Sequence, residues 1–293
     1  MGRELYRAIV DGILYGGVYA LMAVGLTLIF GVLDIINIAQ GILVILAGYL
    51  SYVLSVHLHI DLFLGLLITI PVMFLVGVAI QVLFMRRLRG RERTSMSLLA
   101  SYAVMIIIEG ILYLAFGPDY VQLNASYVTS SVHVLGFYLP YIYLYGFGLA
   151  VALVAALYLM LYRTTFGRSL RATMQDQTAA RLVGIDINRV AALAFGIGVA
   201  VTAVGGMVFG ATNAFNPNSG YDLISRLLAI IIFGGMGSLR GAMIASLGML
   251  VVEDVTSVVW SPIWASTVFF ILLVIILLAR PQGLFGQVEG RKQ

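Results

Sequence analysis

The sequence contains no cysteine, a single lysine and three histidines among 293 residues. The absence of cysteine excludes disulfides, cysteine-ligated zinc and thiol catalysis. The histidines, His57, His59 and His133, form no HExxH or HxxxH pattern, so we expect no zinc-hydrolase site and no other metal site. The lysine, Lys292, lies next to the last residue, whereas a P-loop needs its lysine inside GxxxxGK[ST]. If the protein is a pump, its ATPase is therefore a separate polypeptide.

Charged residues are also few. Only 10% of the chain is charged, 61% is hydrophobic, and the mean hydropathy is +1.05. Because a soluble domain carries about 25% charged residues, this chain could not cover a surface that faces water. The composition predicts an all-α polytopic membrane protein with a single transmembrane domain over residues 1–293. No secretory signal is expected, since Asp11 interrupts the first apolar run.

Long apolar stretches predict the spans, because a helix needs about 20 apolar residues to cross the hydrocarbon core. Seven stretches fit: Ala8–Phe30, Asn37–Val56, Leu62–Phe84, Ser97–Phe116, Tyr141–Tyr162, Val190–Gly210 and Trp264–Ala279. Two further segments, Leu223–Met236 and Gly241–Val259, meet at the glycine-rich Gly234–Gly237. The first of these is short for a full crossing. We therefore expect eight or nine transmembrane helices, of which some could be broken.

Arginines gather in two loops between these spans. The clusters hold ten of the seventeen basic residues, Arg86, Arg87, Arg89, Arg91 and Arg93 in one and Arg163, Arg168, Arg171, Arg181 and Arg189 in the other. This placement is typical of cytoplasmic loops and argues against nucleic acid as a partner. It puts Gly117–Pro140 and Ala211–Asp222 outside, and the C-terminal Arg280, Arg291 and Lys292 inside. The N-terminus then lies outside, although its own Arg3 and Arg7 oppose that placement.

The polar loop at about residues 163–189 interrupts the apolar pattern. Four of its side chains recur at i+4 and predict one helix with an apolar edge: Leu170, Met174, Thr178 and Leu182. Arg171, Gln175 and Asp176 are available for polar contacts, and Gly184 occupies the position of a helix C-terminal glycine. Such a helix can dock into a groove on a partner. It can equally lie on the lipid headgroups, anchored by its arginines.

A spacing of glycines occurs twice along the chain. Phe30-Gly31 is followed by Gly41, Gly48 and Leu50, and Phe233-Gly234 is followed by Gly241, Gly248 and Leu250. Transporters are often built from repeats with broken helices at the substrate site. Glycine is nevertheless common in membrane helices, and this chain has 32 glycines. The repeated spacing is therefore compatible with an internal repeat and with chance.

Four motifs follow one another in a distinctive order. They are Asn37-Ile38-Ala39-Gln40-Gly41; Gly167-Arg168, Arg171-Ala172, Asp176, Ala179-Ala180 and Gly184-Ile185; Gly234-Gly235-Met236-Gly237-Ser238 with Gly241-Ala242; and Arg280-Pro281-Gln282-Gly283-Leu284-Phe285-Gly286. Together they resemble the permease subunits of branched-chain amino acid ABC importers and their relatives, and the resemblance covers nearly the whole chain. Gln40 stands where that family usually has histidine, so a role specific to histidine does not carry over.

This resemblance implies a multi-pass protein of the bacterial plasma (inner) membrane that is not itself an enzyme and holds no cofactor. Its implied partners are membrane lipid, a second permease subunit in a heterodimer, two cytoplasmic ATPase subunits and an extracytoplasmic solute-binding protein. The polar loop would be the helix that couples to the ATPase, with Gly167, Arg168, Arg171, Asp176, Ala180 and Gly184 as its motif residues. Branched-chain or other hydrophobic amino acids rank first as solutes, although relatives also carry urea, short amides and aromatic acids.

Polar residues inside the spans are candidates for the translocation path. Glu109 lies about seven residues, or roughly 10 Å, from the outer end of its span, where a carboxylate usually faces a bundle interior or a cavity. Asn37 and Gln40 begin the second span, where helix N-terminal amides could meet a carboxylate. With Glu253 and Asp254, these residues are expected to converge on one cavity, whose negative charge favours a zwitterionic or neutral solute. A packing role for Glu109 between helices remains the alternative.

A passive channel or facilitator for a small neutral solute such as urea is the main alternative function. An aquaporin-type pore needs two Asn-Pro-Ala turns, and the chain offers only Asn216-Pro217-Asn218. A potassium-type filter sequence is absent. A membrane enzyme is less favoured still, because no paired carboxylates and no nucleophile–base set occur at useful spacing, so we predict no catalytic residues.

Overall fold

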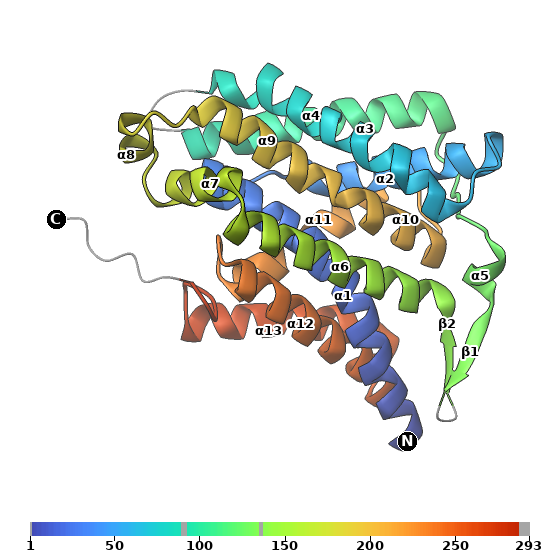
Figure 1. Ribbon diagram of the computed structural model, residues 1–293. Helices are drawn as coiled ribbons and strands as arrows, with labels where there is room; N and C mark the ends of the chain where they lie inside the picture. The colour runs from blue at the N-terminus through green and yellow to red at the C-terminus, as the bar shows by residue number, and fades with distance from the viewer. Residues whose placement is uncertain (1, 89–92, 135–136, 287–293) are drawn as a thin grey trace.

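The computed structural model describes residues 2–88, 93–134 and 137–286. Within them the chain is helical apart from one short hairpin (Figure 1). The elements are α1 (Gly2–Leu33), α2 (Gln40–His57), α3 (Leu62–Leu83), the 3-10 turn η1 (Met85–Arg87), α4 (Arg93–Phe116), α5 (Ser126–Thr129), β1 (Ser131–Val134), β2 (Phe137–Pro140), α6 (Tyr141–Arg163), α7 (Thr165–Gln175), α8 (Gln177–Leu182), α9 (Ile187–Ala200), α10 (Thr202–Thr212), α11 (Ser219–Gly234), α12 (Leu239–Val259) and α13 (Pro262–Ala279). Arg89, Arg91, Arg291 and Lys292, which were expected on the inner side, lie outside the described residues.

In the described part of the chain, eight helices are long and apolar enough to cross a membrane, with α9 and α10 counted together. The prediction of an all-α polytopic membrane protein is confirmed. α11 has 16 residues, which span about 24 Å and fall short of the hydrocarbon thickness. Residues 213–218 precede it without helical structure. The choice between eight and nine spans thus depends on whether this short helix is counted.

The two ends of the bundle carry different elements. The N-terminus and the β1–β2 hairpin lie at one end, whereas α7, α8 and the last described residues lie at the other (Figure 1). The two loops expected outside lie together, since Val121 forms an isolated antiparallel bridge with Phe215. We call these the hairpin end and the α8 end. The N-terminus therefore shares an end with both loops, as the predicted parity requires. At that end Arg7 pairs with Asp11 at 3.5 Å.

α1 is the central helix of the bundle, and most of it is buried. It packs against α12 through glycines that let the two backbones approach. A Cβ at Gly12 would lie 2.7 Å from the Cα of Val251, and a Cβ at Gly16 would lie 3.1 Å from the Cα of Leu247. α4, α6 and α13 lie at the periphery and expose apolar side chains. The core around α1 fixes the helices that enclose the cavity described below.

The chain between α1 and α2 is irregular. α1 ends at Leu33, Asp34 adopts a φ of 55°, and α2 begins only at Gln40 rather than at the expected Asn37. α2 starts inside the bundle, because a Cβ at Gly41 would overlap the carbonyl oxygen of Gly220 in the first turn of α11. The first turns of α2 and α11 therefore meet in the interior. The repeat suggested by the glycine spacing stays a prediction.

Candidate functional site

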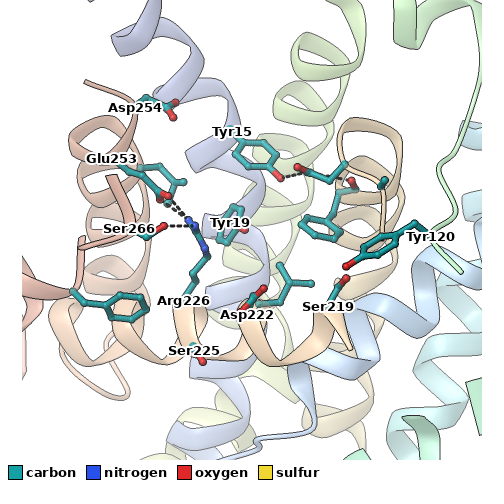
Figure 2. Close-up of a pocket in the computed structure, with 16 residues that line it drawn as sticks. Tyr15, Tyr19, Tyr120, Ser219, Asp222, Ser225, Arg226, Glu253, Asp254 and Ser266 are labelled. Atoms are coloured by element: carbon teal, nitrogen blue, oxygen red, sulfur yellow. Dashed lines mark hydrogen bonds and ion pairs between the residues drawn. The ribbon is translucent and has the colours of Figure 1, made fainter. Parts of the chain in front are cut away.

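An arginine lies in the middle of α11. The Nη1 atom of Arg226 donates to both carboxylate oxygens of Glu253 on α12, at 2.6 and 2.5 Å, and Nη2 donates to the Ser266 hydroxyl on α13 at 3.2 Å (Figure 2). The two charged side chains are only 26% and 11% exposed. Charges inside membrane segments are costly and occur paired, facing a bundle interior or a cavity. This ion pair therefore marks a candidate functional site.

The ion pair faces a cavity of about 690 Å³ between α1, α10, α11, α12 and α13. Its lining comprises Tyr15, Tyr19, Tyr120, Phe209, Asn213, Ala214, Ser219, Asp222, Leu223, Ser225, Arg226, Leu250, Glu253, Asp254, Ser266 and Phe270. Tyr120 and Asn213 belong to the loops of the hairpin end, so the cavity extends toward that end. Among the described residues, including those of the cavity, no group of three or more His, Asp or Glu side chains could hold a metal ion.

A tyrosine wall faces the ion pair across the cavity (Figure 2). The Asn213 side-chain amide donates to the Tyr15 hydroxyl at 2.7 Å and to the Thr212 hydroxyl at 2.9 Å. The Tyr15 ring packs edge-on against Tyr19, with ring centroids 5.3 Å apart, and against Tyr143 at 5.6 Å. Such edge-on contacts hold aromatic rings in place. The wall thus presents both aromatic faces and hydroxyl groups at fixed positions.

Two of the five residues predicted for the path, Glu253 and Asp254, line this cavity. The structure does not bring Asn37 and Gln40 there, because both are fully buried at the start of α2. Asn37 donates to the Gln40 side-chain oxygen at 3.1 Å, and Gln40 donates to the carbonyl oxygen of Gly198 at 3.0 Å. These bonds tie the irregular segment to α9. The expected N-terminal amides of α2 are covered by α11 and offer no open anion site.

Glu109 also lies apart from this cavity. Its Oε2 accepts a hydrogen bond of 2.9 Å from the Tyr221 hydroxyl in the first turn of α11. Both side chains are partly exposed. This contact between helices is the one that a packing role would require. A role for Glu109 in the path stays a prediction.

Arg226, at the centre of the site, was not among the predicted site residues. Arg226 falls inside the predicted span Leu223–Met236, and its partner Glu253 lies 27 residues further on in the next span. An arginine and a glutamate in consecutive spans are a usable signal, because a charge inside a membrane needs a partner. Tyr15 and Asn213 carried no such signal, since an uncharged tyrosine or asparagine does not need an ionic partner inside the membrane.

At the α8 end, α7 starts at a tight turn after α6. The Thr164 hydroxyl accepts from the backbone N–H of Gly167 at 3.0 Å and caps the helix. A Cβ at Gly167 would overlap the carbonyl oxygens of Met160 and Leu161, so this position requires glycine. The Arg171 guanidinium lies 4.7 Å from the centroid of the Tyr162 ring. Arg168 is exposed at the same turn.

The prediction of one continuous helix through this loop is wrong. α7 ends at Gln175, and Asp176 is extended, with a φ of −157°. Its Oδ1 accepts from the backbone N–H of Thr178 at 2.7 Å and of Ala179 at 3.0 Å, which makes it the N-cap of α8. Aspartate favours this position over a helix interior. The apolar edge also breaks here, because Leu170 and Met174 pack inward whereas Thr178 and Leu182 are exposed.

The predicted C-terminal glycine is confirmed. Gly184 has a φ of +85°, and the N–H of Ile185 donates to the Ala180 carbonyl oxygen at 3.0 Å, which is a Schellman ending. Ala180 is buried. Leu182 and Val183 are 85% and 76% exposed, so two adjacent apolar side chains form the tip of α8. The Gln177 side chain donates to the Val32 carbonyl oxygen at 3.0 Å and fastens α8 to the end of α1.

Comparison with known proteins decides the family. Residues 8–277 match the family described as branched-chain amino acid transport system / permease component. The chain belongs to this family. The permease is 28% identical to the high-affinity branched-chain amino acid transport system permease protein BraD of Pseudomonas aeruginosa, over 99% of both chains. It is 29% identical to the permease protein LivH of Escherichia coli K12, over 96% of both.

A more distant relative is the autoinducer 2 import system permease protein LsrC of Klebsiella pneumoniae, 33% identical over 40% of the permease and 36% of LsrC. The family resemblance inferred from the four motifs is confirmed. The permease is a multi-pass inner-membrane protein, and members of its family are membrane subunits rather than enzymes.

Proposed function

We propose that the permease forms part of the membrane channel of an ABC importer for branched-chain or other hydrophobic amino acids. A solute-binding protein outside the membrane delivers the solute, two separate ATPase subunits supply the energy, and a second, different permease subunit completes the channel. The observation that carries this proposal is the mixed-charge cavity around Arg226 in a chain whose full-length relatives are named as branched-chain amino acid permeases.

The lining of the cavity supports an amphiphilic solute. Its volume of about 690 Å³ falls within the usual range for small-molecule sites. Arg226, Asp222 and Asp254 offer charges of both signs, while Phe209 and Phe270 offer apolar surface. An amino acid with an apolar side chain needs both kinds of surface. The cavity extends toward the hairpin end, which is the predicted outer side, where a binding protein would release its solute.

The tip of α8 supports coupling to an ATPase. Leu182 and Val183 project from the opposite end of the bundle, and Asp176 and Gly184 cap the short helix that carries them. An exposed apolar tip on a capped helix suits a groove on a partner. Under this proposal Gly167, Arg168, Arg171, Asp176, Ala180 and Gly184 shape or position the coupling segment. A helix lying on the lipid headgroups would instead bury this Leu-Val pair in the membrane surface, with its arginines among the headgroups.

Uptake into proteoliposomes tests the proposal. The permease is reconstituted with its second permease subunit, its ATPase subunits and its binding protein, and labelled leucine is measured inside. We expect accumulation above the external concentration that requires ATP and stops when the P-loop lysine of the ATPase is replaced. A passive facilitator would equilibrate leucine or urea without ATP, and that result would contradict the importer.

A further inference from the structure

Arg226 does not engage Glu253 through the two parallel nitrogens that arginine–carboxylate pairs favour. Nη1 alone donates to both carboxylate oxygens, and Nη2 donates to Ser266. These bonds use at most three of the five N–H donors of a guanidinium. The side chain is 26% exposed and lines the cavity. Arg226 therefore keeps donor capacity on the side of the cavity.

The charges that line the cavity do not balance. Asp222, Glu253 and Asp254 contribute three carboxylates, whereas Arg226 is the one cationic side chain of the lining. Because Arg226 compensates a single carboxylate, the other two oppose a simple anion and favour an occupant that carries a positive charge. Asp222 precedes Arg226 by one helical turn, about 6 Å along the axis. Both side chains project from α11 into the same cavity (Figure 2).

Arg226 is also the last polar side chain of α11. The rest of the helix reads Leu-Leu-Ala-Ile-Ile-Ile-Phe-Gly, and Leu227, Ile230 and Ile231 are at most 1% exposed. The polar lining of α11 thus ends at Arg226, on the side of the α8 end. A solute that arrives from the hairpin end passes Tyr120 and Asn213 before it reaches the ion pair.

We propose that this cavity binds α-amino acid zwitterions, with the solute carboxylate on Arg226 and the solute ammonium group on Asp222. Glu253 and Ser266 are positioning residues, because their hydrogen bonds hold the guanidinium with its remaining donors toward the solute. The solute brings one charge of each sign, so the charge of the cavity is unchanged when it binds. The inference rests on the proposed function, since it assigns residues to the recognition of that solute class.

The lack of native cysteine makes binding directly measurable. Ser225 precedes Arg226 in the chain, belongs to the cavity lining and is exposed, so Ser225→Cys places a single thiol in the lining. In the purified full-length complex, we expect leucine to slow maleimide labelling of this thiol. Leucinamide, which lacks the carboxylate, and 4-methylpentanoate, which lacks the ammonium group, should each need about tenfold higher concentrations or more for the same protection.

A double variant separates recognition from stability. R226M/E253M in the Ser225→Cys background replaces the ion pair with apolar side chains of similar length, an exchange that buried pairs often tolerate. We expect the complex to assemble and leucine protection to be lost. D186N/R189M removes an exposed ion pair at the α8 end, away from the cavity, and should keep full protection. If R226M/E253M fails to assemble, Arg226→Lys serves instead. It keeps the positive charge but lacks the planar set of guanidinium donors, and it should weaken leucine protection about tenfold.

Several outcomes overturn the proposal. They are equal protection by leucine, leucinamide and 4-methylpentanoate, no protection by leucine at any soluble concentration, or undiminished protection in an assembled R226M/E253M or Arg226→Lys variant. The proposed function fails differently, through leucine protection of the thiol without ATP-driven leucine uptake. If instead leucine uptake is driven by ATP but protection of the thiol does not depend on the charged groups of the solute, this binding site is refuted and the importer function is not.

Discussion

The cavity and the α8 end are built from different chemistry. At the cavity, charged and aromatic side chains from five helices converge, and Arg226 and Glu253 are held by side-chain hydrogen bonds. At the α8 end, the path of the main chain is what is fixed. The side chains of Thr164 and Asp176 cap helices by accepting from backbone N–H groups, and Gly184 ends a helix. A recognition site needs particular functional groups, whereas a docking element needs a fixed outline. The two ends should therefore tolerate different substitutions.

The largest effect is expected at the tip of α8. Leu182→Asp places a charge on a side chain that is 85% exposed, so the permease should remain as stable as the wild type. ATP-driven uptake should fall about 100-fold, as when an interface hot spot is lost. Asn188→Asp is the matched control, because it adds an exposed charge to the same loop without touching the tip. Normal uptake by Leu182→Asp would remove the tip from coupling.

At the cavity, breaking one partner of the ion pair should cost stability as well as transport. Glu253→Ala leaves Arg226 without its carboxylate inside the membrane, and loss of one partner of a buried pair costs about 3–5 kcal/mol. The measurement is the unfolding midpoint in detergent. R226M/E253M should recover most of the lost stability. A Glu253→Ala variant as stable as the wild type would mean that the ion pair is well solvated.

A smaller effect is expected at the N-cap of α8. Asp176→Ala removes the acceptor for two backbone N–H groups and should destabilise α8 by about 1 kcal/mol, with a partial loss of coupling. Asp176→Asn keeps a good cap without the charge and should couple normally. Asp176→Arg, which lacks any capping oxygen, should uncouple ATP hydrolysis from uptake while the chain still inserts. Uncoupling by Asp176→Asn would show that coupling depends on the negative charge of Asp176 and not only on its capping bonds.

The smallest effect is expected at Glu109. Glu109→Gln keeps an acceptor for the Tyr221 hydroxyl and removes the charge. If the contact serves packing, uptake kinetics should stay within about twofold of wild type, without any new dependence on pH between about 5 and 8. Normal expression is the control. A changed pH profile would return Glu109 to the translocation path.

The spans could be predicted because length and hydropathy are properties of single segments. The expected Leu62–Phe84 and Tyr141–Tyr162 agree with α3 and α6 to within one residue at each end. The four motifs predicted the family for the same reason, since each is local and their order is specific. The Gly184 ending was predictable because glycine alone adopts its positive φ without strain.

The remaining features depend on packing or on competing local preferences. The i+4 pattern runs through Asp176, so periodicity concealed the cap that divides α7 from α8. Asn37 and Gln40 look like the start of an open helix, but both are fully buried, and Gln40 bonds to Gly198 of α9. Arg226 meets Glu253 only because α11 and α12 pack side by side. Contacts between distant segments set the site, and hydropathy carries no information about them.

The central claim is that the cavity opens toward the outside of the cell and that α8 faces the inside. Single cysteines test it, because the chain has none of its own. Ser126→Cys at the hairpin end should react with an impermeant thiol reagent in intact cells. Thr178→Cys on α8 should react only after the membrane is opened. Labelling of the Thr178→Cys variant from outside would reverse the predicted orientation in the membrane. It would contradict both the uptake of solute by the cavity from outside and the coupling role of the α8 tip.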